Sequence, residues 1–288
     1  MKSSWMLVAA ALFAVMGVLV KYASADFSSP ELVFYRSIFG LVTIWLGIVW
    51  QTRRWFASLS TAHAATHLWR SLAGFIALVL FFYALGRVPL ATAVTLNYTA
   101  PLFLAVLSAV WLHERHGRGL LLAVLLGFAG IVLLLRPQWQ PETWLPALAA
   151  LVSALFAAIA YVNIKRLGKL GEPEWRVVFY FTLLCSLGGG LWMLLLGFKR
   201  PAPADLPVLI GIGISATLAQ LALTRAYHRG RTLTVGALAY STVVFSALYG
   251  ALLFDEQLPP IAWLGVALIV AAGILAVRVS TPPAADSL

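Results

Sequence analysis

Long apolar stretches, separated by short polar breaks, run through the whole chain. An α-helix needs about 20 residues to cross the roughly 30 Å apolar core of a bilayer. Ten stretches reach about that length, and they lack the alternation of apolar and polar residues that a membrane β-barrel strand requires. The pattern predicts an all-α integral membrane protein with ten transmembrane helices, at approximately 4–22, 30–51, 68–86, 90–113, 118–136, 143–164, 175–197, 206–227, 232–254 and 259–278.

Composition supports this class. Of the 288 residues 62% are hydrophobic and 10% are charged, whereas a soluble domain carries roughly 25% charged residues. The first apolar stretch resembles a signal peptide, but we expect a retained helix because no convincing Ala-x-Ala cleavage site precedes a soluble region. The single Cys185 excludes an intrachain disulfide and is expected to be a small packed residue.

Residues 84–136 match residues 226–278 when the sequence is shifted against itself. Fifteen of the 53 positions are identical without a gap. The match of Tyr98 to Tyr240, and those of Glu and Arg, are harder to obtain by chance in apolar sequence than matches of Leu or Ala. Each copy reads as two apolar helices joined by a polar break. Ten helices then divide into two halves of five, and an odd number of crossings inverts the second half.

Two inverted repeats of five helices (5+5) are typical of secondary transporters that work by alternating access, with substrate near the midplane between the repeats. A structural duplication without transport is the alternative. The net charge of +10 sits in loops, so it indicates topology rather than nucleic-acid binding. With the N-terminus inside, 14 Lys and Arg residues, Arg70 among them, fall on the cytoplasmic side and five on the other. The positive-inside bias therefore predicts that both termini are cytoplasmic.

One charge falls inside a predicted helix. Arg36 lies about two turns into the second helix, and an isolated charge at mid-bilayer costs roughly 2.5–3.5 kcal/mol on insertion scales. It either neutralises a substrate carboxylate or snorkels outward to backbone carbonyls. In the fourth helix, Thr92, Thr95 and Thr99 share one face next to Pro101, which can open or kink the helix. Their hydroxyls either line a cavity or bond their own backbone.

The eighth helix carries the clearest polar stripe, from Thr217 through Gln220 and Thr224 to Tyr227. Polar groups on one face of a membrane helix are expected to face the bundle interior, so Gln220 either binds substrate or joins helices. Tyrosine and phenylalanine rings offer faces for apolar side chains or an ammonium group, unless they belong to the interfacial belt. The predicted substrate-binding residues are Arg36, Tyr83, Thr95, Asn97, Tyr98, Tyr161, Gln220, Thr224, Tyr240 and Phe245.

Other chemistries find little support. His63 and His67 have i,i+4 spacing but no neighbouring carboxylate or Cys in the sequence, so no metal site is predicted. No Lys-Ser/Thr follows Gly188–Gly190, which excludes a P-loop. No catalytic set and no cofactor site is expected, and the chain is not predicted to be an enzyme. No predicted helix has a carboxylate at its middle, which favours facilitated movement down a gradient over proton coupling.

These residues resemble the EamA branch of the drug/metabolite transporter superfamily. The pattern comprises Ala91-Thr92-Ala93, Pro101-Leu102, Leu112-His113-Glu114-Arg115 and Gly127 … Gly130-Ile131-Val132-Leu133, with a looser second copy ending in Asp255-Glu256. Pro30 and Arg36 fit the family's second helix and Lys21 its first. The second copy departs from the pattern, because Val243 replaces the proline.

The resemblance covers essentially the whole chain. It implies a first EamA repeat over 1–137, a second, inverted repeat over 138–279 and a short cytoplasmic tail over 280–288. It also implies a bacterial inner-membrane carrier, most like the YddG-type exporters of aromatic and other amino acids, with a small metabolite and membrane lipid as partners, no nucleic acid, and a monomer or weak homodimer. Export of cationic drugs is the alternative, although residues 4–20 lack the acidic residue usual in such exporters. A channel or scaffold is a further alternative.

Overall fold

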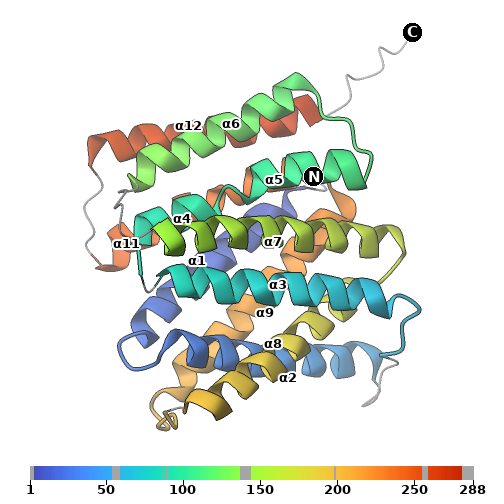
Figure 1. Cartoon of the computed structure of the whole chain (residues 1–288), viewed down its shortest axis with the longest axis vertical. Helices are drawn as coiled ribbons and strands as arrows, with labels where there is room; N and C mark the ends of the chain where they lie inside the picture. Colours follow the sequence, from blue (N-terminus) through green and yellow to red (C-terminus); the bar gives the residue numbers. More distant parts are fainter. Residues whose placement is uncertain are drawn as a thin grey trace.

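The computed structural model describes residues 3–53, 59–85, 87–88, 90–136, 144–197, 199–254 and 259–280. Within these ranges the chain is helical and contains no strand (Figure 1). The helices are α1 (Trp5–Ala23), α2 (Ser29–Thr52), α3 (Ala64–Leu85), α4 (Leu90–Asn97), α5 (Ala100–Trp111), α6 (Arg118–Leu135), α7 (Trp144–Lys169), α8 (Glu174–Leu196), α9 (Leu206–Arg229), α10 (Thr232–Ala239), α11 (Ser241–Phe254) and α12 (Pro260–Ser280).

These helices make ten crossings, because two pairs of short helices each form one crossing. The α4–α5 pair shares the apolar span Ala93–Trp111, and the α10–α11 pair shares Thr232–Gly250. Among the described residues, nine spans are long and apolar enough to cross a bilayer, and α1 adds a shorter apolar run, Trp5–Val20. The predicted fold of ten membrane helices is confirmed.

The packing of the helices shows the two-fold relation between the halves. The contact of α3 with α7 corresponds to the contact of α9 with α1, in which each helix is replaced by its counterpart in the other half. Three further contacts join the two halves: α2 packs on α8, α5 on α10 and α6 on α12. When α4–α5 and α10–α11 are each counted as one crossing, exchanging every crossing with its counterpart in the other half maps these contacts onto one another. Figure 1 shows α6 and α12 together at the top of the bundle and α2 and α8 together at the bottom. The ten crossings bring the start of α1 and the end of α12 to the same side of the bundle.

Glycines let α6 and α12 approach closely. A Cβ atom added to Gly130 would lie 2.8 Å from the carbonyl oxygen of Gly265, and one added to Gly265 would lie 2.6 Å from the carbonyl oxygen of Gly130. Both distances are too short for a side chain. Small residues at such crossings replace the hydrophobic driving force, which is missing between helices in lipid, by close van der Waals contact.

Both broken crossings are interrupted at the matching tyrosine, although only one contains a proline. Pro101 lies at the start of α5 and has no N–H to donate back into α4. At the matching position of the second half, Val243 donates its N–H to the carbonyl of Tyr240 at 3.0 Å, in a tighter i→i+3 turn. The sequence predicted an interruption only near Pro101. The second interruption is associated with packing, because the ring of the buried Tyr240 occupies the space that Gly127 of α6 leaves open.

Candidate functional site

Arg36 lines a small pocket between α2, α8 and α9. The pocket is very small: its cavity volume of about 10 Å³ leaves room for roughly one water molecule. The Nε atom of Arg36 is buried without a hydrogen-bond partner among the described residues. The pocket is lined by Arg36, Ser37, Phe181, Thr182, Ala216, Thr217 and Gln220.

A second arginine borders this pocket. Arg70 of α3 is 2% exposed, and its Nη2 donates to Oε1 of Gln220 at 3.3 Å. The guanidinium carbon lies 3.8 Å from the ring centroid of Phe181, a cation–π contact. Gly74, one turn further along α3, makes room for this stack, since a Cβ there would lie 2.5 Å from Arg70 Nη1 and 2.7 Å from the Phe181 ring.

The position of Arg70 corrects one sequence-based assignment. The third helix was expected from residue 68, with Arg70 counted among the cytoplasmic charges, but α3 begins at Ala64 and buries this side chain. Without Arg70 the charge bias is 13 against five. The orientation of the termini therefore remains a prediction, now based on a slightly smaller excess of positive residues on the cytoplasmic side. What distinguishes Arg70 is that Gln220 and Phe181, on helices distant in sequence, are its neighbours.

The tyrosines that match across the two halves face each other. Tyr98 follows α4 and Tyr240 follows α10, and their ring centroids lie 6.3 Å apart at 51°. Tyr240 is fully buried, and its hydroxyl has no hydrogen-bond partner among the described residues. The junction between the two broken crossings thus contains an aromatic pair with an unused polar group.

The predicted threonines and the predicted asparagine differ in their partners. The hydroxyls of Thr95 and Thr224 are buried without a partner in the described part of the chain. Asn97 instead donates its Nδ2 to Ser153 Oγ at 2.6 Å, which joins α4 to α7. Thr224 lies one turn after Gln220 on α9, on the face where the stripe was predicted. Asn97 therefore has a structural contact, whereas the two threonines keep their hydroxyls available.

The remaining predicted residues are aromatic. Tyr161 stacks on Tyr227 with ring centroids 5.0 Å apart. Tyr83 lies near the end of α3, where Arg87 stacks over its ring at 4.1 Å. Phe245 is half-buried in α11. The structure therefore brings Arg36 and Gln220 to one pocket and Tyr98 and Tyr240 to one junction, and places Tyr83 apart, at a helix end.

A carboxylate joins two loops at each end of the bundle. At one end Glu31, in the first turn of α2, accepts the backbone N–H of Lys199 and, at 2.7 and 2.6 Å, the N–H and the hydroxyl of Ser28. Tyr35 donates its hydroxyl to the carbonyl of Lys199 at 3.1 Å. These contacts fix the α1–α2 connection to the α8–α9 connection. We refer to Ser28, Glu31, Tyr35 and Lys199 as the Glu31 network.

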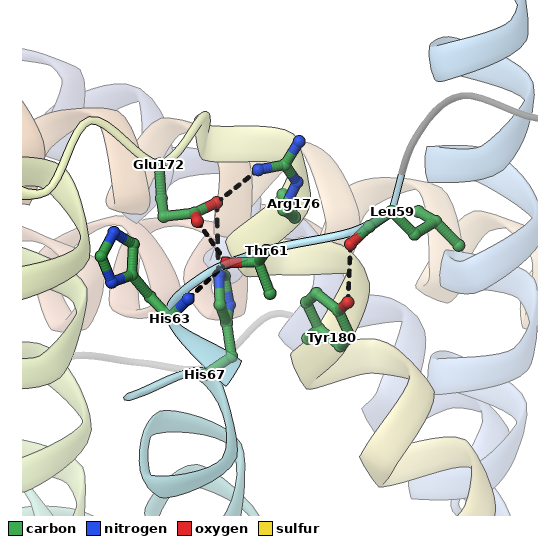
Figure 2. A network of polar contacts seen from close by, with 7 residues as sticks. All are labelled: Leu59, Thr61, His63, His67, Glu172, Arg176 and Tyr180. Atoms are coloured by element: carbon green, nitrogen blue, oxygen red, sulfur yellow. Dashed lines mark hydrogen bonds and ion pairs between the residues drawn. The ribbon is translucent and has the colours of Figure 1, made fainter. Parts of the chain in front are cut away.

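At the opposite end Glu172 joins the α7–α8 connection to the segment before α3 (Figure 2). It accepts from Thr61 and, at 2.8 Å, from Nη1 of Arg176, and His67 Nε2 lies 3.4 Å from it. Tyr180 of α8 donates its hydroxyl to the carbonyl of Leu59 at 2.7 Å and packs against the ring of His67. We refer to Thr61, His67, Glu172, Arg176 and Tyr180 as the Glu172 network.

The Glu172 carboxyl is held ionised. Burial opposes its ionisation, but hydrogen bonds from Thr61 and Arg176, the positive charge of Arg176 and the contact with His67 at 3.4 Å outweigh burial, so the pKa of Glu172 is lowered below its ordinary 4.5. Thr61 and Glu172 are 111 positions apart in the chain. The sequence places no carboxylate near His63 and His67, but the fold brings Glu172 next to His67. The described residues contain no cluster of three or more metal-binding side chains.

The glutamate of the family-like motif also makes a contact between the halves. Glu114 lies just after α5, and its Oε1 accepts the hydroxyl of Thr232, the first residue of α10, at 2.9 Å. Its counterpart Glu256 lies outside the described residues. Glu114 thus ties the end of one broken crossing to the start of the other, as expected for a carboxylate that stands at a helix end rather than in a substrate pocket.

Two inverted halves of five helices, two interrupted crossings and a pocket with polar groups deep in the bundle define a multi-pass membrane transporter. The model of the EamA-like transporter family matches residues 2–136 and 144–278. The chain belongs to the EamA-like transporter family. The family predicted from the sequence is therefore confirmed, and it is a family of transporters rather than enzymes.

Named relatives carry different substrates. The chain is 33% identical over 263 residues to the pseudopaline exporter CntI of Pseudomonas aeruginosa, covering 91% of this chain and 90% of the relative. It is 29% identical to a riboflavin transporter of Vibrio cholerae, covering 92% and 89%. A protein of known crystal structure superposes with a TM-score of 0.83 at 21% identity over 97% of this chain and 98% of that chain, which shows the common fold. The narrower likeness to YddG-type amino-acid exporters stays a prediction.

Proposed function

We propose that this protein exports amino acids or related small metabolites across the bacterial inner membrane by alternating access, with both termini in the cytoplasm, as a monomer or weak homodimer. The observation that carries the proposal is the group of unpartnered polar atoms inside the bundle, on Arg36, Arg70, Thr224 and Tyr240. Buried polar groups are normally hydrogen-bonded, so unused donors beside a pocket favour a bound substrate over a purely structural bundle or scaffold.

The two carboxylate networks are suited to act as alternating gates. Each one ties a connection of one half to a connection of the other, and they stand at opposite ends of the bundle. Opening toward one side of the membrane requires one network to break while the other holds. Both networks are formed together here and the pocket is small, which corresponds to an occluded conformation between the two open ones.

The charge of the pocket favours this substrate class over cationic drugs. A cation would meet the guanidinium groups of Arg36 and Arg70, and like charges in a medium of low dielectric repel strongly. An amino acid brings a carboxylate that a guanidinium binds through two parallel hydrogen bonds. Gln220 and Thr217, which line the pocket, provide further polar partners, and the ring of Phe181 provides an apolar surface.

Coupling to protons has no evident carrier in the pocket. The described carboxylates that make contacts all stand at helix ends or in connections: Asp26, Glu31, Glu114, Glu172, Glu174 and Asp205. We therefore expect facilitated export down the substrate gradient. Accumulation in proteoliposomes that depends on an imposed pH gradient would contradict this part of the proposal.

Counterflow in proteoliposomes tests the function. Liposomes are loaded with unlabelled amino-acid mixtures, and uptake of labelled threonine, methionine and tryptophan is followed. We expect transient accumulation that Gln220→Ala and Tyr98→Ala abolish. Tyr22→Ala is the matched control, because Tyr22 is 69% exposed at the end of α1. If no amino acid accumulates in liposomes containing folded protein, the proposed substrate class is wrong.

A further inference from the structure

Two positive charges stand close together inside the bundle, and no carboxylate of the described residues is paired with either of them. Arg70 bonds Gln220, and Gln220 and Arg36 line the same pocket. Within the described ranges, the titratable groups close enough to act on Arg70 are Cys185, Tyr161 and Arg36 itself, and the one that acts on Arg36 is Cys185. Neither set contains a carboxylate. Ion pairs in the described part of the chain involve His67, Arg176, Lys199, Arg225 and Arg229 instead.

The guanidinium atoms that lack a partner at this site are hydrogen-bond donors rather than acceptors. The Nε atoms of Arg36 and Arg70 are buried without a partner among the described residues. Gln220 supplies one carbonyl oxygen to Arg70, and Phe181 supplies a ring face, but neither carries a negative charge. A buried charge costs several kcal/mol unless it is paired. What would complete this site is a set of negatively charged oxygen atoms.

We propose that Arg36 and Arg70 together bind the anionic groups of the transported substrate, so that the substrate is an organic anion with two negative charges, on carboxylate or phosphate groups. The proposal rests on the transport function proposed above and narrows its substrate class. A guanidinium presents a planar fork of donors that matches both carboxylate and phosphate. Two such forks are balanced by a dianion, whereas a zwitterionic neutral amino acid leaves the pair of positive charges uncompensated.

The first test is ligand-induced stabilisation of the purified full-length protein in a neutral detergent. The probes are glutamate, succinate and glycerol 3-phosphate, each compared at the same ionic strength with its uncharged or less charged counterpart, glutamine, succinamide and glycerol. A ligand that binds the folded state raises the melting temperature by an amount that grows with the ratio of its concentration to its dissociation constant. We expect at least one of the three anions to bind about tenfold more tightly than its counterpart, as expected for loss of a charged hydrogen bond.

Variants assign the effect to the two arginines. Arg36→Gln and Arg70→Gln should each weaken anion binding about tenfold or more, and Arg36→Lys and Arg70→Lys should retain part of it, because they keep the charge and lose the fork. Arg166→Gln is the control, since Arg166 is exposed at the end of α7 beside Trp111. If a Gln variant does not fold, the Lys variants and the comparison of each anion with its counterpart on the wild-type protein still test the proposed anion site.

The outcomes separate this inference from the transport function. Wild-type protein that binds none of the three anions better than its counterpart overturns the anion site, whatever the variants do. Counterflow of neutral amino acids that Arg36→Gln and Arg70→Gln leave unchanged also overturns it, and keeps the proposed transporter of amino acids. Binding of succinate or glycerol 3-phosphate that depends on both arginines, with no counterflow of neutral amino acids, supports the anion site and removes neutral amino acids as substrates.

Discussion

The two ends of the bundle are closed by networks of the same design but different chemistry. The pseudo-two-fold axis relates the α1–α2 connection to the α7–α8 connection, and the α8–α9 connection to the α2–α3 connection, so Glu31 and Glu172 hold equivalent pairs of segments. The described hydrogen-bond partners of Glu31 are neutral donors, two backbone N–H groups and a hydroxyl. Glu172 is bound by a guanidinium, an imidazole and a hydroxyl.

This difference shows that an inverted repeat can keep a geometry while its interactions diverge. A carboxylate bound by neutral donors loses little when its charge is removed, provided that an acceptor oxygen remains. A carboxylate bound by a buried cation leaves that cation unpaired when its charge is lost. The two ends should therefore respond differently to the same carboxylate substitution and to pH.

The largest effect is expected for Glu172→Gln. The amide keeps one acceptor but removes the charge that faces Arg176 and His67, and hydrogen bonds to charged groups contribute roughly 1.5–3 kcal/mol each. We expect the end closed by the Glu172 network to open. The measurement is labelling of a cysteine at Ser37, which is 2% exposed in the pocket, by an impermeant maleimide, in a Cys185→Ala background.

The side from which the reagent acts makes this test specific. If the positive-inside prediction holds, the Glu172 end is cytoplasmic, and labelling should rise in inside-out vesicles and not in intact cells. Asp26→Asn, whose carboxylate is 61% exposed at the other end of the bundle, serves as a control for a general loss of negative charge. If labelling from both sides stayed at the wild-type level, the proposal that Glu172 acts as a gate would be wrong.

The second effect is the pH dependence of the same network. Because the folded pKa of Glu172 lies below its ordinary 4.5, its contribution to stability is fully present above about pH 4.5 and is lost as the pH falls through the lower, folded value. The difference in melting temperature between wild type and Glu172→Gln should be constant from pH 8 to pH 5 and shrink below about pH 4.5. The groups that face this carboxyl are His67 and Arg176, with His63 nearby.

Histidine titration is removed from that measurement by repeating it in a His67→Gln background. The shrinkage below about pH 4.5 should persist there, because it belongs to the carboxyl. A difference that already declines between pH 7 and pH 6 in this background would contradict the assignment to Glu172.

A smaller effect is expected at the other end for Glu31→Gln. One amide oxygen can still accept the N–H of Lys199, and the donors that lose their partner are neutral, so the loss should be about 1 kcal/mol. Glu31→Ala removes the capping box of α2 as well as the contact to Lys199, and should cost more. The melting temperatures of both variants, and labelling at Ser37→Cys in intact cells, measure the effect. If Glu31→Gln destabilised as much as Glu172→Gln, the distinction between the two networks would be wrong.

Architecture follows from the sequence much more directly than the site does. Apolar runs of sufficient length and a repeat in one register leave few arrangements other than ten helices in two inverted halves, because in lipid every backbone group must be satisfied within a helix. The pattern also pointed to Arg36 and Gln220, which the structure places at one pocket, since polar residues in a membrane helix are few and conspicuous.

The parts that were not predicted depend on neighbours distant in sequence. Arg70 stands close to a helix start and looks like an interfacial charge until Gln220 and Phe181 are seen beside it. The partners Thr61 and Glu172 are separated by four complete crossings, α3, α4–α5, α6 and α7. The interruption at Tyr240 could not be predicted, because no proline lies there. It is associated instead with packing of the Tyr240 ring against Gly127, which no local sequence pattern reveals.

The smallest effect concerns the two tyrosines that complete the networks. Tyr35 donates to the carbonyl of Lys199 at 3.1 Å and Tyr180 to that of Leu59 at 2.7 Å. Neither bond involves a charge, so Tyr35→Phe and Tyr180→Phe should each cost about 0.5–1 kcal/mol, with Tyr22→Phe as the exposed control. Since both ends share this interaction type, the two losses in melting temperature should agree closely. A much larger loss for Tyr180→Phe would mean that the ends differ in packing, through the contact of Tyr180 with His67, and not only in the charge of the partners that surround each carboxylate.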